Sequence, residues 1–234
     1  MNSFSKYLFL SSLILLIPVL FLPIWEVYLE APQYPEPIGM YIYIDKIEGI
    51  GENDLDNINL LNHYIGMKKI IPESIPELKY MKYAIYFFLA SGIVVFILKN
   101  KKWILYIWTM LLILSSIFAL YDFNKWEQDY GSNLDPKAPI KVPGMTYKPP
   151  LIGQKQLLNI TATSVPSWGG ILFIISIMVS TSSSIIIYFS DKQTNINHDN
   201  VINNQTTHHF SNTSHLSNKI KHHQTKLDLK QPLI

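Results

Sequence analysis

Four apolar segments separated by polar stretches constrain this chain of 234 residues more than any other feature. A helix needs about 20 mostly apolar residues to cross a hydrocarbon core of about 30 Å. The segments are residues 7–27, 83–98, 103–121 and 168–189. We therefore predict a mainly α membrane protein with four transmembrane helices, and the low share of charged residues, 15%, agrees with this class.

The distribution of lysine sets the expected orientation. Residues 99–102 form a short, strongly basic turn, and such turns stay in the cytoplasm. Lys6 and the C-terminal tail then lie on the same side of the membrane. The sequence thus predicts a multi-pass protein of the bacterial inner membrane, with both termini in the cytoplasm and with loops 28–82 and 122–165 outside.

The two outer loops are each too short to bury a core of their own, so we expect them to pack together as one small, loop-rich α+β cap. In the first loop, residues 40–44 alternate like a strand, and residues 53–66 have the spacing and end signals of an amphipathic helix. In the second loop, residues 154–159 suit a turn of helix and residues 160–165 an extended segment. Residues 1–190 would thus form a membrane domain with a cap.

Residues 191–234 form a polar tail that is rich in His and Asn. The tail has few apolar residues to bury, so we predict that it is disordered and cytoplasmic. Six of the seven histidines of the chain lie in it. They could bind Zn, Ni or Cu loosely, but we favour the interpretation that they are simply solvated.

The only histidine outside the tail is His63, on the predicted helix of the first loop. Asn59, Asn62 and His63 share one face of that helix, and Met67 directly follows the predicted helix stop at Gly66. These side chains form a polar stripe that ends in an imidazole and a thioether. If His63 binds a metal, Asn59 or Asn62 is expected to orient its imidazole.

Three Gly-Met pairs place thioethers in the outer loops, at Met40, Met67 and Met145. Thioether sulfur and neutral imidazole together favour copper, especially Cu(I). The chain has no cysteine, which excludes thiolate metal sites. The predicted copper ligands are His63, Met67 and Met145, with Met40 as a fourth candidate.

A purely structural interpretation is open for the same residues. Methionine side chains are adaptable fillers of irregular gaps in a core, and asparagine amides often bond to neighbouring backbone. A lone histidine near methionines is more often a packed, hydrogen-bonded residue than a metal ligand. The sequence by itself leaves copper binding and simple packing as alternatives.

The membrane segments lack the groups that several functions need. None has an ionisable residue in its middle third, which disfavours ion pumps and proton-coupled transporters, and none contains a histidine, which excludes a membrane haem with two axial imidazoles. Phosphate-binding glycine loops and the GxSxG motif are absent, and the lysines form no nucleic-acid surface. We expect neither catalysis by this chain alone nor nucleic-acid binding.

Six short stretches of the two outer loops carry a resemblance. They are residues 62–67 (NHYIGM), 72–78 (PESIPEL), 126–131 (WEQDYG), 134–136 (LDP), 140–145 (IKVPGM) and 149–153 (PPLIG). With their surroundings in residues 1–190, they resemble a group of small four-helix membrane proteins associated with nitrous-oxide reductase gene clusters. The resemblance implies a role in denitrification, beside a periplasmic copper enzyme and its copper-delivery and maturation proteins.

Three functions follow as expectations. The first is an inner-membrane accessory protein that binds or passes copper through the His/Met site during maturation of nitrous-oxide reductase. The second is a structural or docking subunit of a respiratory or assembly complex that binds no metal. The third is an electron-transfer accessory to the reductase.

Overall fold

A computed structural model describes residues 3–98, 101–140, 142, 144, 146–193 and 196. The predicted disorder of the tail therefore concerns residues that lie outside the described part of the chain. Contacts group Met1–Ile185 into one compact unit and Ile186–Ile234 into a second. The strands and helices described below belong to the first unit, except that the last helix continues into the second.

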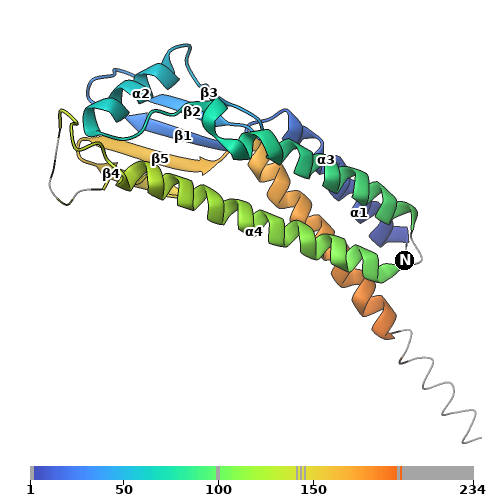
Figure 1. Ribbon diagram of the computed structural model, residues 1–234. Helices are drawn as coiled ribbons and strands as arrows, with labels where there is room; N and C mark the ends of the chain where they lie inside the picture. The colour runs from blue at the N-terminus through green and yellow to red at the C-terminus, as the bar shows by residue number, and fades with distance from the viewer. Residues whose placement is uncertain are drawn as a thin grey trace, which may run out of the picture. The chain divides into compact units, whose positions relative to one another are not determined.

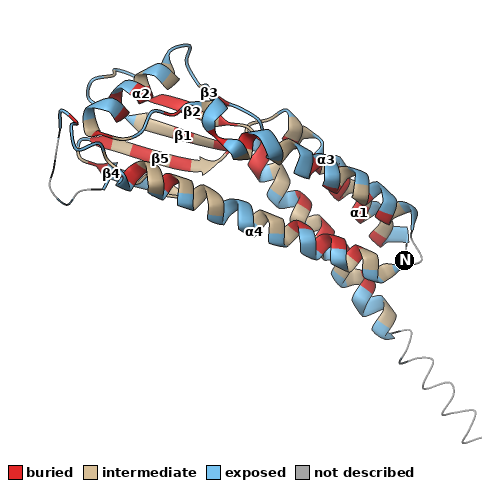
Figure 2. Cartoon of the chain, in the orientation of Figure 1, coloured by how far each residue is buried: buried red, intermediate tan, exposed pale blue. Residues whose placement is uncertain are grey.

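Within the described residues, four helices are long and apolar enough to cross a membrane, which confirms their predicted number. They are α1 (Ser3–Leu16) with the 3-10 turn η1 (Pro18–Leu20), α3 (Pro76–Ile97), α4 (Lys102–Ser132) and the last helix, Trp168–Gln193 (Figure 1). Large apolar side chains on these helices are exposed, as Ile93, Phe118 and Met178 illustrate. Exposed stretches along α3 and α4 appear in pale blue in Figure 2 and suit contact with lipid.

The first predicted span, residues 7–27, extends too far at its C-terminal end. Helix α1 stops at Leu16, the 3-10 turn begins at Pro18, and Trp25 is already the first residue of a strand. The two prolines at 18 and 23 explain the stop, because proline cannot donate the hydrogen bond that would continue the helix. The Trp25 side chain lies in the protein interior, where its Nε1 donates to Ser164 Oγ at 2.7 Å.

Helices α3 and α4 are longer than the apolar segments that predicted them. Helix α3 begins at Pro76 instead of residue 83, and α4 continues past residue 121 to Ser132. A helix of 31 residues is about 46 Å long, well above the roughly 30 Å of a hydrocarbon core. The last turns of α4 therefore belong to the cap, a name we keep for residues 28–82 and 122–165.

Strands from both predicted loops form one five-stranded antiparallel sheet in the order β3-β2-β1-β5-β4. The strands are β1 (Trp25–Glu30), β2 (Ile38–Ile42), β3 (Ile47–Gly49), β4 (Gly153–Leu157) and β5 (Ile160–Pro166) (Figure 1). The central strand β1 pairs with β2 on one side and with β5 on the other. The two loops thus share one sheet, and the extended segment predicted at 160–165 is strand β5.

Two local predictions for the cap were wrong. Residues 154–159, expected as a turn of helix, form strand β4 and the start of a tight hairpin in which Leu158 has a positive φ of 57°. Pairing of β4 with β5 outweighs the local preference there. In addition, the strand expected at 40–44 begins and ends two residues earlier, because the chain turns where the Tyr43 N–H donates to Lys46 O at 2.9 Å.

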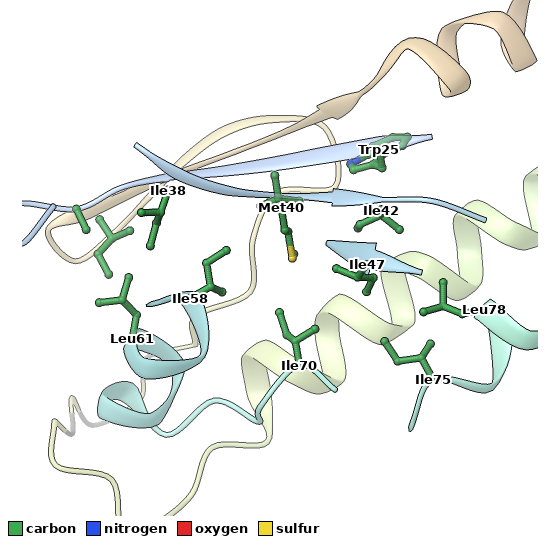
Figure 3. Packing of buried hydrophobic residues seen from close by; sticks show 13 residues of the cluster. Trp25, Ile38, Met40, Ile42, Ile47, Ile58, Leu61, Ile70, Ile75 and Leu78 are labelled. Atoms are coloured by element: carbon green, nitrogen blue, oxygen red, sulfur yellow. The ribbon is translucent and has the colours of Figure 1, made fainter. Parts of the chain in front are cut away.

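Helix α2 (Asp54–Ile65) confirms the amphipathic helix predicted over residues 53–66, and it packs on the sheet. Its apolar side chains Ile58 and Leu61 enter a core that also contains Met40 of β2 and Ile70 of the segment after the helix (Figure 3). Phe123, Trp126 and Tyr130 pack against the same core. The end of α4 thus contributes to the core of the cap, which accounts for its length.

Small hydroxyl side chains bring α1 and the last helix close together. Ser176 Oγ donates to Ser12 O at 2.8 Å, and Ser183 Oγ donates to Ser5 O at 2.8 Å. These serines are buried, and their side chains are short enough for the two backbones to approach closely. Polar contacts of this kind hold helices together where the surrounding lipid offers no hydrogen bonds.

Candidate functional site

Helix α2 is fixed at both ends. At its start, Asp54 Oδ2 accepts hydrogen bonds from the N–H groups of Gly39 and Gly51, both at 2.9 Å, so the helix is tied to strand β2. At its end, Gly66 takes the left-handed conformation with φ of 81°, as predicted, and the Met67 N–H donates to Asn62 O at 2.8 Å. The helix therefore presents its side chains from a rigid support.

The two asparagines of the predicted site hold the chain that follows the helix. The Ile70 N–H donates to Asn59 Oδ1 at 2.7 Å, and Asn59 Nδ2 donates to Ile70 O at 3.1 Å. Asn62 Nδ2 donates to Lys68 O at 3.4 Å. Both asparagines are buried. Their amides thus satisfy main-chain groups, which is the structural role that the sequence left open for them.

The predicted polar stripe of Asn59, Asn62 and His63 is divided in the structure, because the two asparagines are buried whereas His63 is exposed. The ring centroid of His63 is 6.1 Å from that of its neighbour Tyr64. Among the described residues, no group of three or more His, Asp or Glu side chains is placed to hold a metal ion. His63 as a copper ligand stays a prediction.

The structure brings two of the predicted methionine ligands to one cavity. Met40 is buried in the core with an exposed fraction of 6%, and Met67 packs against Tyr147 and Leu157. Both line the same cavity, and His63 is not among the residues that line it. Met145 lies outside the described residues. Of the four predicted copper ligands, Met40 and Met67 are thus the two that line the cavity within the described part of the chain.

This cavity has a volume of about 70 Å³ and lies inside the cap. Strands β1 and β2, helix α2, the end of α4 and the segment 147–160 all contribute to its wall. The wall is mostly aliphatic and aromatic. Its polar side chains are Asn62, Glu127 and Tyr147, together with Trp126 and Tyr130, which combine an aromatic ring with one polar atom.

Glu127 is the unusual member of this wall. It belongs to the end of α4 beyond the apolar segment, and only 2% of it is exposed. Its Oε2 has no hydrogen-bond partner among the described residues. Burial raises the pKa of Glu127 from 4.5 to about 7, and the positive charge of Lys148 offsets part of this rise. A carboxyl group that is half ionised near neutral pH is typical of functional sites.

Tyr147 is a second residue of this wall with a buried polar group. Only 1% of it is exposed, and its hydroxyl has no partner among the described residues. Its backbone is fixed, because the Tyr147 N–H donates to Gly131 O at 2.8 Å. Gly131 is required for this approach, since a Cβ there would lie 2.3 Å from Lys148 Cα. The segment that carries Tyr147 therefore lies directly against the end of α4.

Lys148 is half-buried and lies close enough to Glu127 for its charge to lower the pKa of that carboxyl group. Its Nζ donates to Asn124 Oδ1 at 2.6 Å, and Lys155 Nζ donates to Lys148 O at 3.0 Å. The lysine charge thus lies near Glu127 while its ammonium group is hydrogen-bonded to another side chain. The carboxyl group remains without a direct cationic partner among the described residues.

Sequence reasoning missed Glu127 and Tyr147 as functional candidates. A signal for Glu127 was present, because Phe123, Glu127 and Tyr130 share one face of a helix and the acid interrupts an aromatic stripe. That signal becomes visible only when α4 is known to continue beyond residue 121. For Tyr147 no local signal exists, since its burial depends on contacts with distant residues.

Comparison with known proteins adds no relative: no family model matches the chain, and no curated protein is similar to it. The resemblance to proteins associated with nitrous-oxide reductase gene clusters therefore remains an expectation from the sequence.

Proposed function

We propose that this chain is a membrane-anchored accessory protein, without catalytic activity of its own, whose cap docks a protein partner outside the cytoplasm. The observation that carries the proposal is a patch of exposed side chains on the cap, Leu60, His63, Tyr64 and Ile140, which we call the α2 patch. Leu60, Tyr64 and Ile140 are 49%, 46% and 47% exposed. Exposed apolar clusters of this kind on a protein surface are typical of interaction sites.

The α2 patch is suited to docking because its parts are held in place. Leu60, His63 and Tyr64 lie on one face of α2 at helical spacing, and the Ile140 N–H donates to Tyr64 O at 2.9 Å. The helix beneath them is anchored at Asp54 and Asn59, as described above. A preformed surface loses little conformational entropy when a partner binds.

We also propose which protein docks on the α2 patch and in which compartment it does so. The resemblance of the loops favours nitrous-oxide reductase or one of its copper-delivery and maturation proteins as the partner. The basic turn at residues 99–102 favours an orientation in the bacterial inner membrane with both termini in the cytoplasm. In that orientation, the α2 patch faces the compartment in which the reductase matures.

A crosslinking experiment tests the docking proposal. A photoreactive residue is placed at Tyr64 in the full chain, and adduct formation with purified nitrous-oxide reductase and with each maturation protein is measured. Ile152 serves as the matched control, because it is an exposed apolar residue of the cap outside the α2 patch. We expect an adduct from position 64 and none from position 152. Equal adducts from both positions, or none from either, would contradict the proposal.

Copper binding is a second candidate function, favoured by the shared cavity of Met40 and Met67. Two thioethers in a largely apolar wall suit Cu(I), which prefers soft ligands. Among the described residues no observation favours the electron-transfer function, so we do not propose it.

The copper proposal is tested by titration with Cu(I). Protein truncated after Ser190 removes the tail histidines, and Met40→Leu and Met67→Leu keep the side-chain volume while removing sulfur. His63→Ala and Met145→Leu test the other two predicted ligands. Stoichiometric Cu(I) binding that is lost in the methionine variants would support a copper site in the cap. Absence of binding by the truncated protein itself would leave docking as the only function proposed.

A further inference from the structure

One face of the five-stranded sheet carries no buried side chain. Side chains of a strand alternate between its two faces, and Trp25, Val27 and Met40 enter the core that α2 and the end of α4 cover. The strand register places the opposite set on the second face, which we call the acidic face: Glu26, Tyr28, Glu30, Tyr41, Thr161 and Thr163. These six side chains are half-buried or exposed. The acidic face is therefore accessible to a partner in the described part of the chain.

The charged side chains that the strands place on this face are all negative. Glu26 and Glu30 belong to the central strand β1, and the edge strand β3 adds Glu48. Glu48 pairs with Lys46 Nζ at 2.7 Å, whereas Glu26 and Glu30 form no ion pair among the described residues. No lysine of the five strands lies on this face. Such a face repels a second copy of itself and anionic lipid headgroups, and it attracts a cationic partner.

Two tyrosines on neighbouring strands specify which cation fits best. Burial, a hydrogen bond to the Tyr41 side chain and the charge of Glu26 together raise the pKa of Tyr28 to about 12, so the three side chains lie close together. Both rings are half-buried and leave part of their surface accessible. A guanidinium group can stack on an aromatic ring and pair with a carboxylate at the same time, which an ammonium group does less well. The acidic face therefore suits arginine better than lysine.

The size of the sheet sets the expected strength of binding. With strands about 4.8 Å apart and about 3.4 Å per residue along each strand, the five strands span roughly 400 Å². Stable protein complexes bury about 800 Å² on each partner. A partner that covers only this face therefore binds transiently, with a dissociation constant in the micromolar range that rises with salt concentration.

We propose that the acidic face is a docking surface for an arginine-rich protein segment. The guanidinium groups of the segment pair with the carboxylates of Glu26 and Glu30 and stack on the rings of Tyr28 and Tyr41. The surface lies on the side of the sheet opposite to α2, so it goes beyond docking at the α2 patch and allows the cap to hold two partners at once. The two surfaces share no residue, and each can be tested, and can fail, independently.

The test uses the full chain in a neutral detergent, with fluorescent octa-arginine as the probe. We expect saturable binding, with octa-lysine at least about threefold weaker because it lacks guanidinium groups. The double variant Glu26→Gln, Glu30→Gln should weaken octa-arginine binding about tenfold. The matched control Asp56→Asn, Glu73→Gln removes two negative charges at exposed positions of α2 and η2, away from the acidic face, and should change binding by less than about twofold.

A second measurement keeps the proposal testable if the double variant of the acidic face does not fold. A photoreactive residue is placed at Thr163 or, as a control on the α2 patch, at Tyr64, and adducts with octa-arginine are measured. We expect an adduct from position 163 and none from position 64. Equal weakening by the two double variants, equal binding of octa-lysine, or absence of saturable binding would each overturn the proposal. So would adducts from position 163 that join two copies of the chain instead of the peptide.

Discussion

The side-chain amide of Asn59 binds both main-chain polar groups of Ile70, with the Ile70 N–H donating to Oδ1 at 2.7 Å and Nδ2 donating to Ile70 O at 3.1 Å. The two residues are eleven positions apart and both are buried. This pair closes the segment that leads from α2 toward α3. A polar side chain on the buried face of α2 thus stabilises a segment that has no regular secondary structure.

Replacement of Asn59 by leucine should destabilise the cap strongly. Leucine has a similar volume but leaves the N–H and C=O of Ile70 buried without partners, which costs about 2–5 kcal/mol in the free energy of unfolding. The measurement is chemical or thermal unfolding of the cap in detergent. Asn57→Leu, on the same helix at a half-buried position, should change the free energy by less than about 1 kcal/mol. Equal effects of the two substitutions would contradict the role of Asn59.

Glu127 should make the stability of the folded protein depend on pH. Its pKa is raised in the folded state, to about 7 from an ordinary value of 4.5, so the folded protein binds more protons than the unfolded chain between these values. Stability contributed by Glu127 is therefore lost as the pH rises from about 4.5 to 7, by up to about 3 kcal/mol, and is constant above that range.

Unfolding midpoints measured from pH 4 to pH 8 check this dependence. Glu127→Gln should remove the loss of stability between pH 4.5 and 7, since glutamine does not titrate. Glu73→Gln, at an exposed position, should leave the pH profile as it is in the unsubstituted protein. A profile that is the same with and without Glu127 would show that another group causes it.

Gly131→Ala should displace the segment that carries Tyr147. The added Cβ would lie 2.3 Å from Lys148 Cα and 2.4 Å from Lys148 N, distances at which backbone has to move. We expect a loss of about 2–4 kcal/mol in the free energy of unfolding, although alanine is the better helix former. Ser132→Ala, at the exposed neighbouring position, should be neutral within about 0.5 kcal/mol. Wild-type stability of Gly131→Ala would contradict this packing.

Two substitutions at Met40 separate packing from metal binding. Met40→Ala removes a buried side chain from the core and should cost about 2–5 kcal/mol, whereas Met40→Leu keeps the volume and should cost less than about 1.5 kcal/mol. If Met40 only packs, Cu(I) affinity is the same in Met40→Leu as in the unsubstituted chain. If Met40 is a ligand, the leucine variant stays folded and loses Cu(I) affinity.

The parts of the fold that were predicted correctly have local causes. The apolar segments identify four membrane helices by their length, and residues 53–66 identify α2 by spacing and by the glycine at its end. Gly66 takes the left-handed conformation because a residue with a Cβ would be strained there. Helical periodicity and helix end signals of this kind are contained in a sequence segment of only a few helical turns.

The parts that were missed depend on distant partners. Strand β4 exists because residues 153–157 pair with β5, and Trp25 belongs to strand β1 instead of the predicted membrane span because β1 pairs with β2 and β5. The burial of Glu127 follows from the packing of the end of α4 against the sheet. The copper ligands were predicted from residue types and from the three Gly-Met pairs, and the structure brings only Met40 and Met67 of the described candidates to one cavity.

The pairing of β1 with β5 has a consequence for biosynthesis. Trp25 pairs with Pro166, so the central strand of the sheet lacks one neighbour until 141 further residues have been made. At about 5–20 residues per second, the ribosome needs roughly 7–28 s for this stretch. During that interval β1 has one free edge that other strands could join. Prompt insertion into the membrane of α1, before β1, and of α3 and α4, after it, would protect the nascent chain from aggregation. A chaperone that covers the free edge of β1 would have the same effect.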